Sequence, residues 1–276
     1  MNRFIKKIIF FVLFLLNISL QINGQDESTT TIPESELLPQ NTTEAQRCDL
    51  IRKQYGRMAR RVLFVSIERF PQDMEEMEYH CALGMKLSQG LRVYAKCLKG
   101  LGRQTLSILN HGIRRNLRPR CVNLKKRQAM LTELRCATNS TLSGWSHCIR
   151  GVDRQLRYFS QQNTMKNFFP NMCCLYLSGK ECIRESAKTQ EGCAQGANVR
   201  RFFVSTMDAV VKDVLDLVCG QFQKIEQCYQ KNPDGMVIIN DIRANGTDPP
   251  EAEETFIIEP MLNLTSKLAS DDVIEE

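Results

Sequence analysis

The chain has 276 residues, with 37 Lys and Arg against 31 Asp and Glu, twelve cysteines and only three histidines. The histidines form no His-Glu-x-x-His pattern, and the one close cysteine pair has no residues between its members, so no metal site or other cofactor is predicted. The formal net charge of +6 hides an uneven distribution of charge along the chain.

Residues 1–24 have the three parts of a signal peptide. Three cations fall in the first seven residues, an uninterrupted apolar run covers residues 8–16, and Gly24 is a small residue suited to cleavage before Gln25. The run is too short to cross a bilayer as a helix, which takes about 20 apolar residues, and no later segment qualifies. We therefore expect a secreted, extracellular protein with no transmembrane segment.

Charge and composition divide the rest of the chain. Residues 25–47 are acidic, rich in Ser, Thr, Pro, Glu and Gln, and free of aromatic residues, so this arm is expected to be disordered. Residues 48–232 hold all twelve cysteines and 31 Lys and Arg against 15 Asp and Glu, whereas residues 233–276 hold 2 against 11. A basic, cysteine-rich domain at 48–232 is therefore predicted between two acidic arms, either as one unit or as two with a boundary near 138–170.

The basic domain is predicted to be all-α. Apolar residues recur there at steps of three and four, the spacing of one helix face, and alternating strand patterns are almost absent. The stripes cover residues 51–65, 74–85, 94–108, 124–136, 145–159, 172–183 and 199–217. The stripe that begins at Trp145 is the most regular, and Asn139 and Ser140 precede it as expected caps. We expect a disulfide-stapled bundle of about six to seven helices.

The cysteines are predicted to be structural and fully paired, because thiols in the secretory pathway form disulfides. They lie on the apolar stripes or at helix ends. Cys173 and Cys174 are adjacent, so a bond between them is sterically disfavoured and each needs its own partner. The predicted disulfide cysteines are Cys48, Cys81, Cys97, Cys121, Cys136, Cys148, Cys173, Cys174, Cys182, Cys193, Cys219 and Cys228.

The acidic tail at 233–276 leaves two interpretations open. It contains two short apolar runs, residues 236–239 and 256–258, separated by turn-forming residues. A mostly disordered tail is favoured. The alternative is that the runs dock on the basic domain, or pair with each other, as strand-like pieces.

Four Asn-x-Ser/Thr acceptor sequences follow the leader, at Asn41, Asn139, Asn245 and Asn263. An asparagine that is glycosylated must lie at the surface, and a loop position is expected for each. Together with the leader, these sequences predict a glycoprotein.

Positive charge is most concentrated in residues 114–127. This segment holds no acid and seven cations, Arg114, Arg115, Arg118, Arg120, Lys125, Lys126 and Arg127. Such a cluster attracts polyanions, of which anionic glycans and anionic membrane surfaces are available outside a cell. No aromatic residues interleave with the cations, so nucleic acid is not an expected partner. A solvated turn between two helices is the favoured interpretation of this cluster, with the acidic tail as a candidate cover, and polyanion binding is the alternative.

The cysteine spacing of the second half carries a resemblance. Cys173-Cys174 is followed by Cys182 and Cys193, then by a long amphipathic stretch to Cys219, and finally by Cys228. This pattern resembles that of uncharacterised secreted cysteine-rich helical proteins of arthropods and nematodes. The resemblance implies a helical extracellular module without known catalytic residues, and it adds no site.

Three functions are compatible with these features. The chain is predicted to be a non-catalytic extracellular binding or structural protein whose basic cluster engages polyanions. A carrier of a small apolar ligand is the first alternative, motivated by the Met- and Phe-rich stripes. A secreted enzyme is the second, although no acid–base pair, nucleophile motif or catalytic residue is identified.

Overall fold

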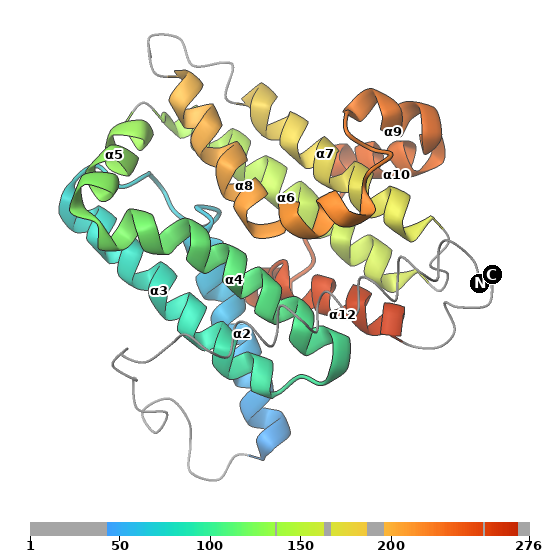
Figure 1. Ribbon diagram of the computed structural model, residues 1–276, viewed down its shortest axis with the longest axis horizontal. Helices are drawn as coiled ribbons and strands as arrows, with labels where there is room; N and C mark the ends of the chain where they lie inside the picture. Colours follow the sequence, from blue (N-terminus) through green and yellow to red (C-terminus); the bar gives the residue numbers. More distant parts are fainter. Residues whose placement is uncertain (1–42, 136, 163–166, 187–195, 251, 270–276) are drawn as a thin grey trace. The chain divides into compact units, whose positions relative to one another are not determined.

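A computed structural model describes residues 43–135, 137–162, 167–186, 196–250 and 252–269. Within these ranges the chain is all-α and has no strand, as predicted (Figure 1). The helices are α2 (Glu44–Val62), α3 (Met74–Lys96), α4 (Gly100–Val122), α5 (Leu124–Leu134), α6 (Asn139–Gln161), α7 (Phe168–Ser186), α8 (Gly196–Val218), α9 (Ile225–Lys231), α10 (Pro233–Asn245), α11 (Ala252–Thr255) and α12 (Ile258–Ala269). The predicted leader, Asn41, Cys136 and Cys193 lie outside the described residues.

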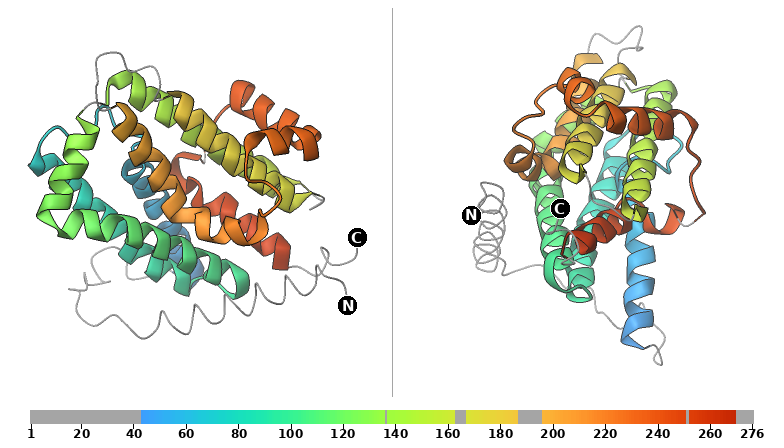
Figure 2. Two further views of the ribbon diagram at one scale, coloured as in Figure 1. Left: turned by 45° about the horizontal axis from the view of Figure 1, so that its top comes forward. Right: turned by 90° about the vertical axis from the view of Figure 1, so that its right-hand side faces the viewer.

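The described residues from Ile51 onward form one compact unit, and the described residues before Ile51 group separately. Within the larger unit, helices from both sides of the region 138–170 pack together. The α4 helix contacts α8, and α12 contacts both α4 and α6 (Figures 1 and 2). The basic domain and the described part of the acidic tail therefore share one helical assembly.

Local side chains fix where several helices begin. Asp73 caps α3 by accepting a hydrogen bond from the Glu76 backbone N–H at 2.8 Å. At α6 the cap is Thr138, one residue before the expected pair. Its hydroxyl accepts from the Thr141 N–H, and the Thr141 hydroxyl accepts from the Thr138 N–H. Asn139 is consequently the first residue of the helix.

The apolar stripe at 94–108 does not form one helix. The α3 helix ends at Lys96, and α4 begins at Gly100, whose φ of +53° is in the left-handed region that favours glycine. Tyr94 before the break and Leu106 after it are both buried in one apolar cluster. Leu106 is not on the predicted stripe, whose members after the break, Leu101, Thr105 and Ile108, are only half-buried, so the spacing across the break does not mark one buried face.

The most regular predicted stripe is confirmed as a buried helix face. Trp145 at its start is 2% exposed, stacks on Phe203 of α8 at a centroid distance of 4.3 Å, and donates its indole N–H to the Leu63 carbonyl. Phe70, from the loop before α3, packs on Phe203 at 5.6 Å. This aromatic cluster joins α6 and α8 to the loop between α2 and α3.

Disulfides connect neighbouring helices through their buried faces. The pairs are Cys81–Cys121, Cys148–Cys182, Cys173–Cys219 and Cys174–Cys228. Successive helical residues point about 100° apart, so the adjacent cysteines reach two different partners. Cys48 and Cys97 are also disulfide-bonded, and the described part of the chain contains no free cysteine, as predicted.

The described C-terminal residues are helical and packed, which differs from the disordered or strand-like tail expected from the sequence. Met236 and Ile239 of α10 are 1% and 0% exposed, and Phe256 is 2% exposed. Positions 236 and 239 share one helix face, which leaves Val237 69% exposed. Packing of that face on α6 and α7 overrides the strand propensity of the β-branched run.

A buried ion pair fastens this C-terminal segment to α6. The Asp153 carboxylate receives a hydrogen bond from Arg157 Nε at 2.8 Å and another from the Ile257 backbone N–H at 2.6 Å. Arg157 also donates to the Thr255 hydroxyl at 3.2 Å. Burial raises the pKa of Asp153, although Arg157 and the Ile257 N–H both favour its ionised form.

Candidate functional site

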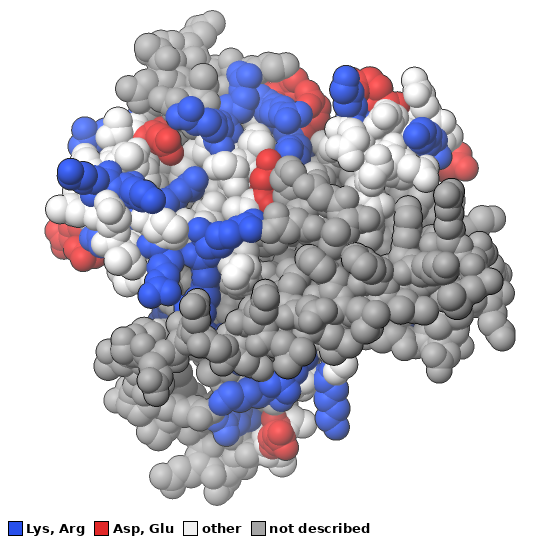
Figure 3. Space-filling view, in the orientation of Figure 1, with Lys and Arg blue, Asp and Glu red and all other residues white. Residues whose placement is uncertain are grey.

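The corner where α4 meets α5 exposes positive charge. Arg118 lies near the end of α4, and Lys125 and Lys126 lie in the first turn of α5; all three side chains are exposed. Within the described ranges, none of them is in an ion pair. Figure 3 shows Lys and Arg gathered on this side of the molecule, where Figure 1 draws α5 and the neighbouring end of α4. We call Arg118, Lys125 and Lys126 the basic corner.

Arg120 belongs to the predicted cluster but is engaged inside the fold. Its guanidinium donates to the Ser205 hydroxyl of α8 at 3.1 Å and lies over the Phe202 ring, 4.8 Å from the centroid. Burial lowers the pKa of Arg120, against the attraction of Glu133. This arginine packs α4 on α8 and does not face a ligand.

The remaining cations of the cluster also have partners. Arg115 donates to the Ala209 carbonyl at 3.3 Å, and Arg114 has an interaction of its own. Arg127 bonds the Cys121 carbonyl with Nε at 3.0 Å and pairs with Glu78 at 3.2 Å. Of the seven predicted cations, Arg115, Arg118, Lys125 and Lys126 are exposed, and Arg114, Arg120 and Arg127 are half-buried. Arg118, Lys125 and Lys126 are the exposed members of the cluster that form no ion pair among the described residues.

The basic corner is held rigidly. The Cys81–Cys121 disulfide ties the end of α4 to α3, and the Arg127 bonds close the turn from the other side. Asn123, the single residue between the two helices, caps α5 by accepting from the Lys126 N–H at 3.1 Å. A ligand that binds here meets cations whose backbone is already fixed, so little entropy is lost in ordering it.

Two apolar side chains at the same corner were not singled out from the sequence. Val122, the last residue of α4, is 69% exposed, and Leu124, the first of α5, is 67% exposed. Their neighbour Cys121 is 4% exposed. Their position beside Asn123 and the two lysines was the one sign in the sequence that they are exposed. It was missed because apolar residues at a helix end are ordinarily assigned to the core.

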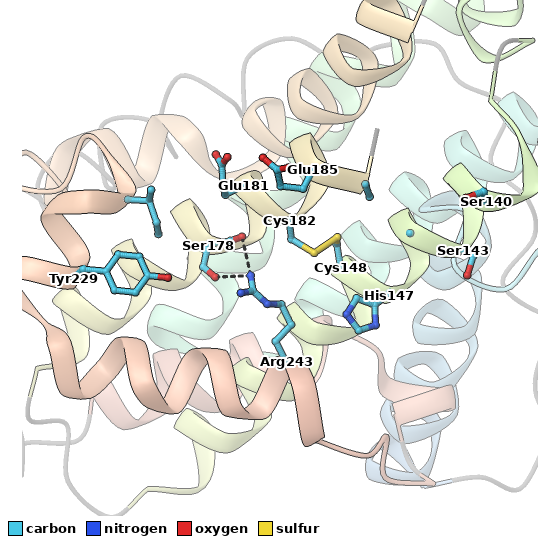
Figure 4. Close-up of a pocket in the computed structure, with 13 residues that line it drawn as sticks. Ser140, Ser143, His147, Cys148, Ser178, Glu181, Cys182, Glu185, Tyr229 and Arg243 are labelled. Carbon is cyan, nitrogen blue, oxygen red and sulfur yellow. Dashed lines mark hydrogen bonds between the residues drawn. A yellow bond between two sulfur atoms is a disulfide. The ribbon is translucent and has the colours of Figure 1, made fainter. Parts of the chain in front are cut away.

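A groove of about 730 Å³ runs between α6, α7 and the α9–α10 segment. Its lining includes His147, Glu181, Glu185 and Tyr229 (Figure 4). Arg243 of α10 crosses the groove and donates to the Ser178 hydroxyl at 2.9 Å and to the Ser178 carbonyl at 3.3 Å. The arginine is thus occupied in joining α10 to α7.

The titratable side chains of the groove lie on either side of a disulfide. Figure 4 shows His147 on one side of the Cys148–Cys182 disulfide and the two glutamates, Glu181 and Glu185, on the other. Nucleophilic and acid–base catalysis need such groups within hydrogen-bond reach of one another or of a shared substrate atom. Among the residues that the structure describes, no group of three or more His, Cys, Asp or Glu side chains is placed to hold a metal ion.

Three of the predicted glycosylation sites are described, and all three side chains are exposed. Their setting differs from the expected loops, because Asn139 begins α6, Asn245 ends α10 and Asn263 lies within α12. Thr265, the threonine of the acceptor sequence at Asn263, donates a hydrogen bond from its hydroxyl to the Leu262 carbonyl at 2.9 Å. Attachment of a glycan at these positions requires surface access, which each of them has.

Comparison with family models, curated proteins and solved structures found no significant match for this chain. Among the described residues, no helix is both long and apolar enough to cross a membrane. The basic corner and the groove are therefore the features from which a function can be inferred.

Proposed function

We propose that this chain is a secreted, glycosylated, non-catalytic protein that binds extracellular polyanions through its basic corner. The disulfides are typical of proteins that fold in an oxidising compartment. The exposed asparagines of three acceptor sequences are compatible with glycosylation. The resemblance in cysteine spacing to secreted helical proteins points to the same compartment.

The observation that carries the proposal is the placement of Lys125 and Lys126. They lie in the first turn of α5, where the helix dipole disfavours cations, and that turn contains no acid. Arg118 adds a third exposed charge from α4. A sulfate, phosphate or carboxylate group bound at this corner relieves the repulsion and faces the positive end of the helix.

The two alternative functions have less support. The Met and Phe stripes that motivated a carrier are used in packing, since Met77 and Phe203 are 0% and 1% exposed in one apolar cluster. An enzyme would use the groove, where His147 lies on one side of the Cys148–Cys182 disulfide and the two glutamates lie on the other. We therefore propose binding rather than transport or catalysis.

Heparin-affinity chromatography of the secreted protein tests the proposal. The triple variant R118Q/K125Q/K126Q should elute at clearly lower salt than the parent, because it loses the three exposed cations of the corner. The matched control K96Q/K99Q/R103Q removes the same charge from exposed residues at the opposite end of α4. It should elute near the parent. Equal shifts for both variants, or no shift for either, would contradict a role for the corner.

A further inference from the structure

The apolar side chains of Val122 and Leu124 stand out from the surface of a basic protein. They are 69% and 67% exposed and are separated by one residue, so two large apolar side chains are accessible at the α4–α5 corner. Single exposed apolar residues are common on protein surfaces. Two at one disulfide-anchored turn are a more specific feature.

The cations of the basic corner flank Val122 and Leu124 along the chain. Arg118 precedes Val122 by one helical turn and therefore lies on the same side of α4. Lys125 and Lys126 directly follow Leu124. Two acids of the neighbouring helices have cationic partners of their own, since Glu78 pairs with Arg127 at 3.2 Å and Glu133 lies 3.7 Å from Arg201.

This combination distinguishes two kinds of polyanion. A sulfated glycan offers charge to the cations but no apolar phase to Val122 and Leu124. The interface of an anionic membrane offers both, because apolar side chains enter the acyl boundary while long basic side chains reach the headgroups. The surface chemistry of the corner fits an anionic lipid interface better than it fits a soluble glycan.

We propose that the α4–α5 corner docks on anionic lipid surfaces by inserting Val122 and Leu124 below the headgroups, with Arg118, Lys125 and Lys126 bound to lipid phosphates or carboxylates. This inference deepens the proposed function and depends on it. Each cation near an anionic surface strengthens binding about fivefold. Each inserted apolar side chain adds about tenfold. Binding through one such corner is therefore reversible and falls steeply with added salt.

Vesicle co-sedimentation separates insertion from simple charge attraction. The probes are vesicles of phosphatidylcholine alone and of phosphatidylcholine with phosphatidylserine. The parent should bind only the mixed vesicles, and V122S/L124S should bind them about a hundredfold more weakly while its elution from heparin stays unchanged. V237S is the matched control, because Val237 on α10 is also 69% exposed but has no place in the corner. It should bind like the parent.

A fluorescent probe reports insertion directly. The only native indole, Trp145, is 2% exposed and is shielded from the bilayer. In the variant L124W the added indole should be quenched by brominated lipids in mixed vesicles, whereas the parent should show no quenching. Quenching at this position supports insertion even if V122S/L124S is unstable.

The outcomes distinguish the inference from the proposed function. If V122S/L124S binds vesicles like the parent and the L124W indole is not quenched, insertion is refuted. The polyanion function then stands, provided that R118Q/K125Q/K126Q still weakens heparin binding. If the corner substitutions change neither vesicle nor heparin binding, both proposals are overturned.

Discussion

Replacement of Arg157 by Met should be among the most destabilising single changes in this fold. The methionine keeps most of the apolar stem but removes the guanidinium that pairs with Asp153. The side chains of Arg157 and Asp153 are only 10% and 2% exposed, so solvent does not screen the pair. The substitution leaves a carboxylate buried, with the Ile257 N–H as its remaining partner.

The size of the effect follows from that isolated charge. Breaking a buried ion pair by removal of one partner costs about 3–5 kcal/mol in free energy of unfolding. The double variant D153N/R157M removes the charge while the amide oxygen still accepts from Ile257. It should therefore be more stable than R157M and lie about 1–3 kcal/mol below the parent. Because the two residues are in contact, their effects should not be additive.

Urea unfolding, followed by the fluorescence of Trp145, measures these differences with the disulfides intact. The deficit of R157M should shrink at about pH 4. Burial raises the folded pKa of Asp153, so the folded protein takes up the proton first and stability rises as pH falls toward the unfolded pKa. A loss below about 1 kcal/mol for R157M, or no recovery in D153N/R157M, would show that the pair does not fasten the C-terminal segment.

Two further predictions concern a buried histidine and a disulfide. His80 is 6% exposed and stacks on Phe64 at 4.3 Å, and burial lowers its pKa from 6.5 to about 4. Because the unfolded chain is protonated first, the parent should lose roughly 3 kcal/mol of stability as pH falls through that window. H80L should flatten this dependence in the same urea assay, and an unchanged slope would mean that His80 is not the group responsible. C174A/C228A opens a bond between residues 54 apart in sequence and should lower the free energy of unfolding by about 4 kcal/mol. If C174A/C228A lowers the urea midpoint no more than a surface substitution does, the Cys174–Cys228 disulfide does not make this contribution to stability.

The helical architecture was predictable because its signal is local. A stripe such as Ile51, Tyr55, Met58 and Val62 repeats at helical spacing, and all four side chains are buried in α2. The stripe predicted at 94–108 was wrong as a single helix, because α3 ends at Lys96 and α4 begins at Gly100. Apolar residues can keep a helical spacing across a loop, so periodicity alone does not locate the end of a helix.

The sequence predicted where the candidate site lies along the chain, but it did not predict which of its cations face solvent. Charge density located residues 114–127, and the exposed lysines are there. Whether a cation faces solvent depends on partners far along the chain, such as Ser205, which lies 85 residues beyond Arg120. The same holds for α10, whose packed face is defined by α6 and α7 rather than by its own β-branched residues. Long-range contacts of this kind leave no mark on local spacing.

The order of the disulfides has a consequence for biosynthesis. A chain emerges from the ribosome with its N-terminal residues first. Cys148 and Cys182 therefore become available while Cys173 and Cys174, which lie between them, still lack their partners 46 and 54 residues further on. Cys173, Cys174 and Cys182 can then each form a bond with Cys148, and only Cys182 is its native partner. Thiol–disulfide exchange must remove early mispaired bonds, and the native set closes only after Cys228, the last cysteine of the chain, has been made.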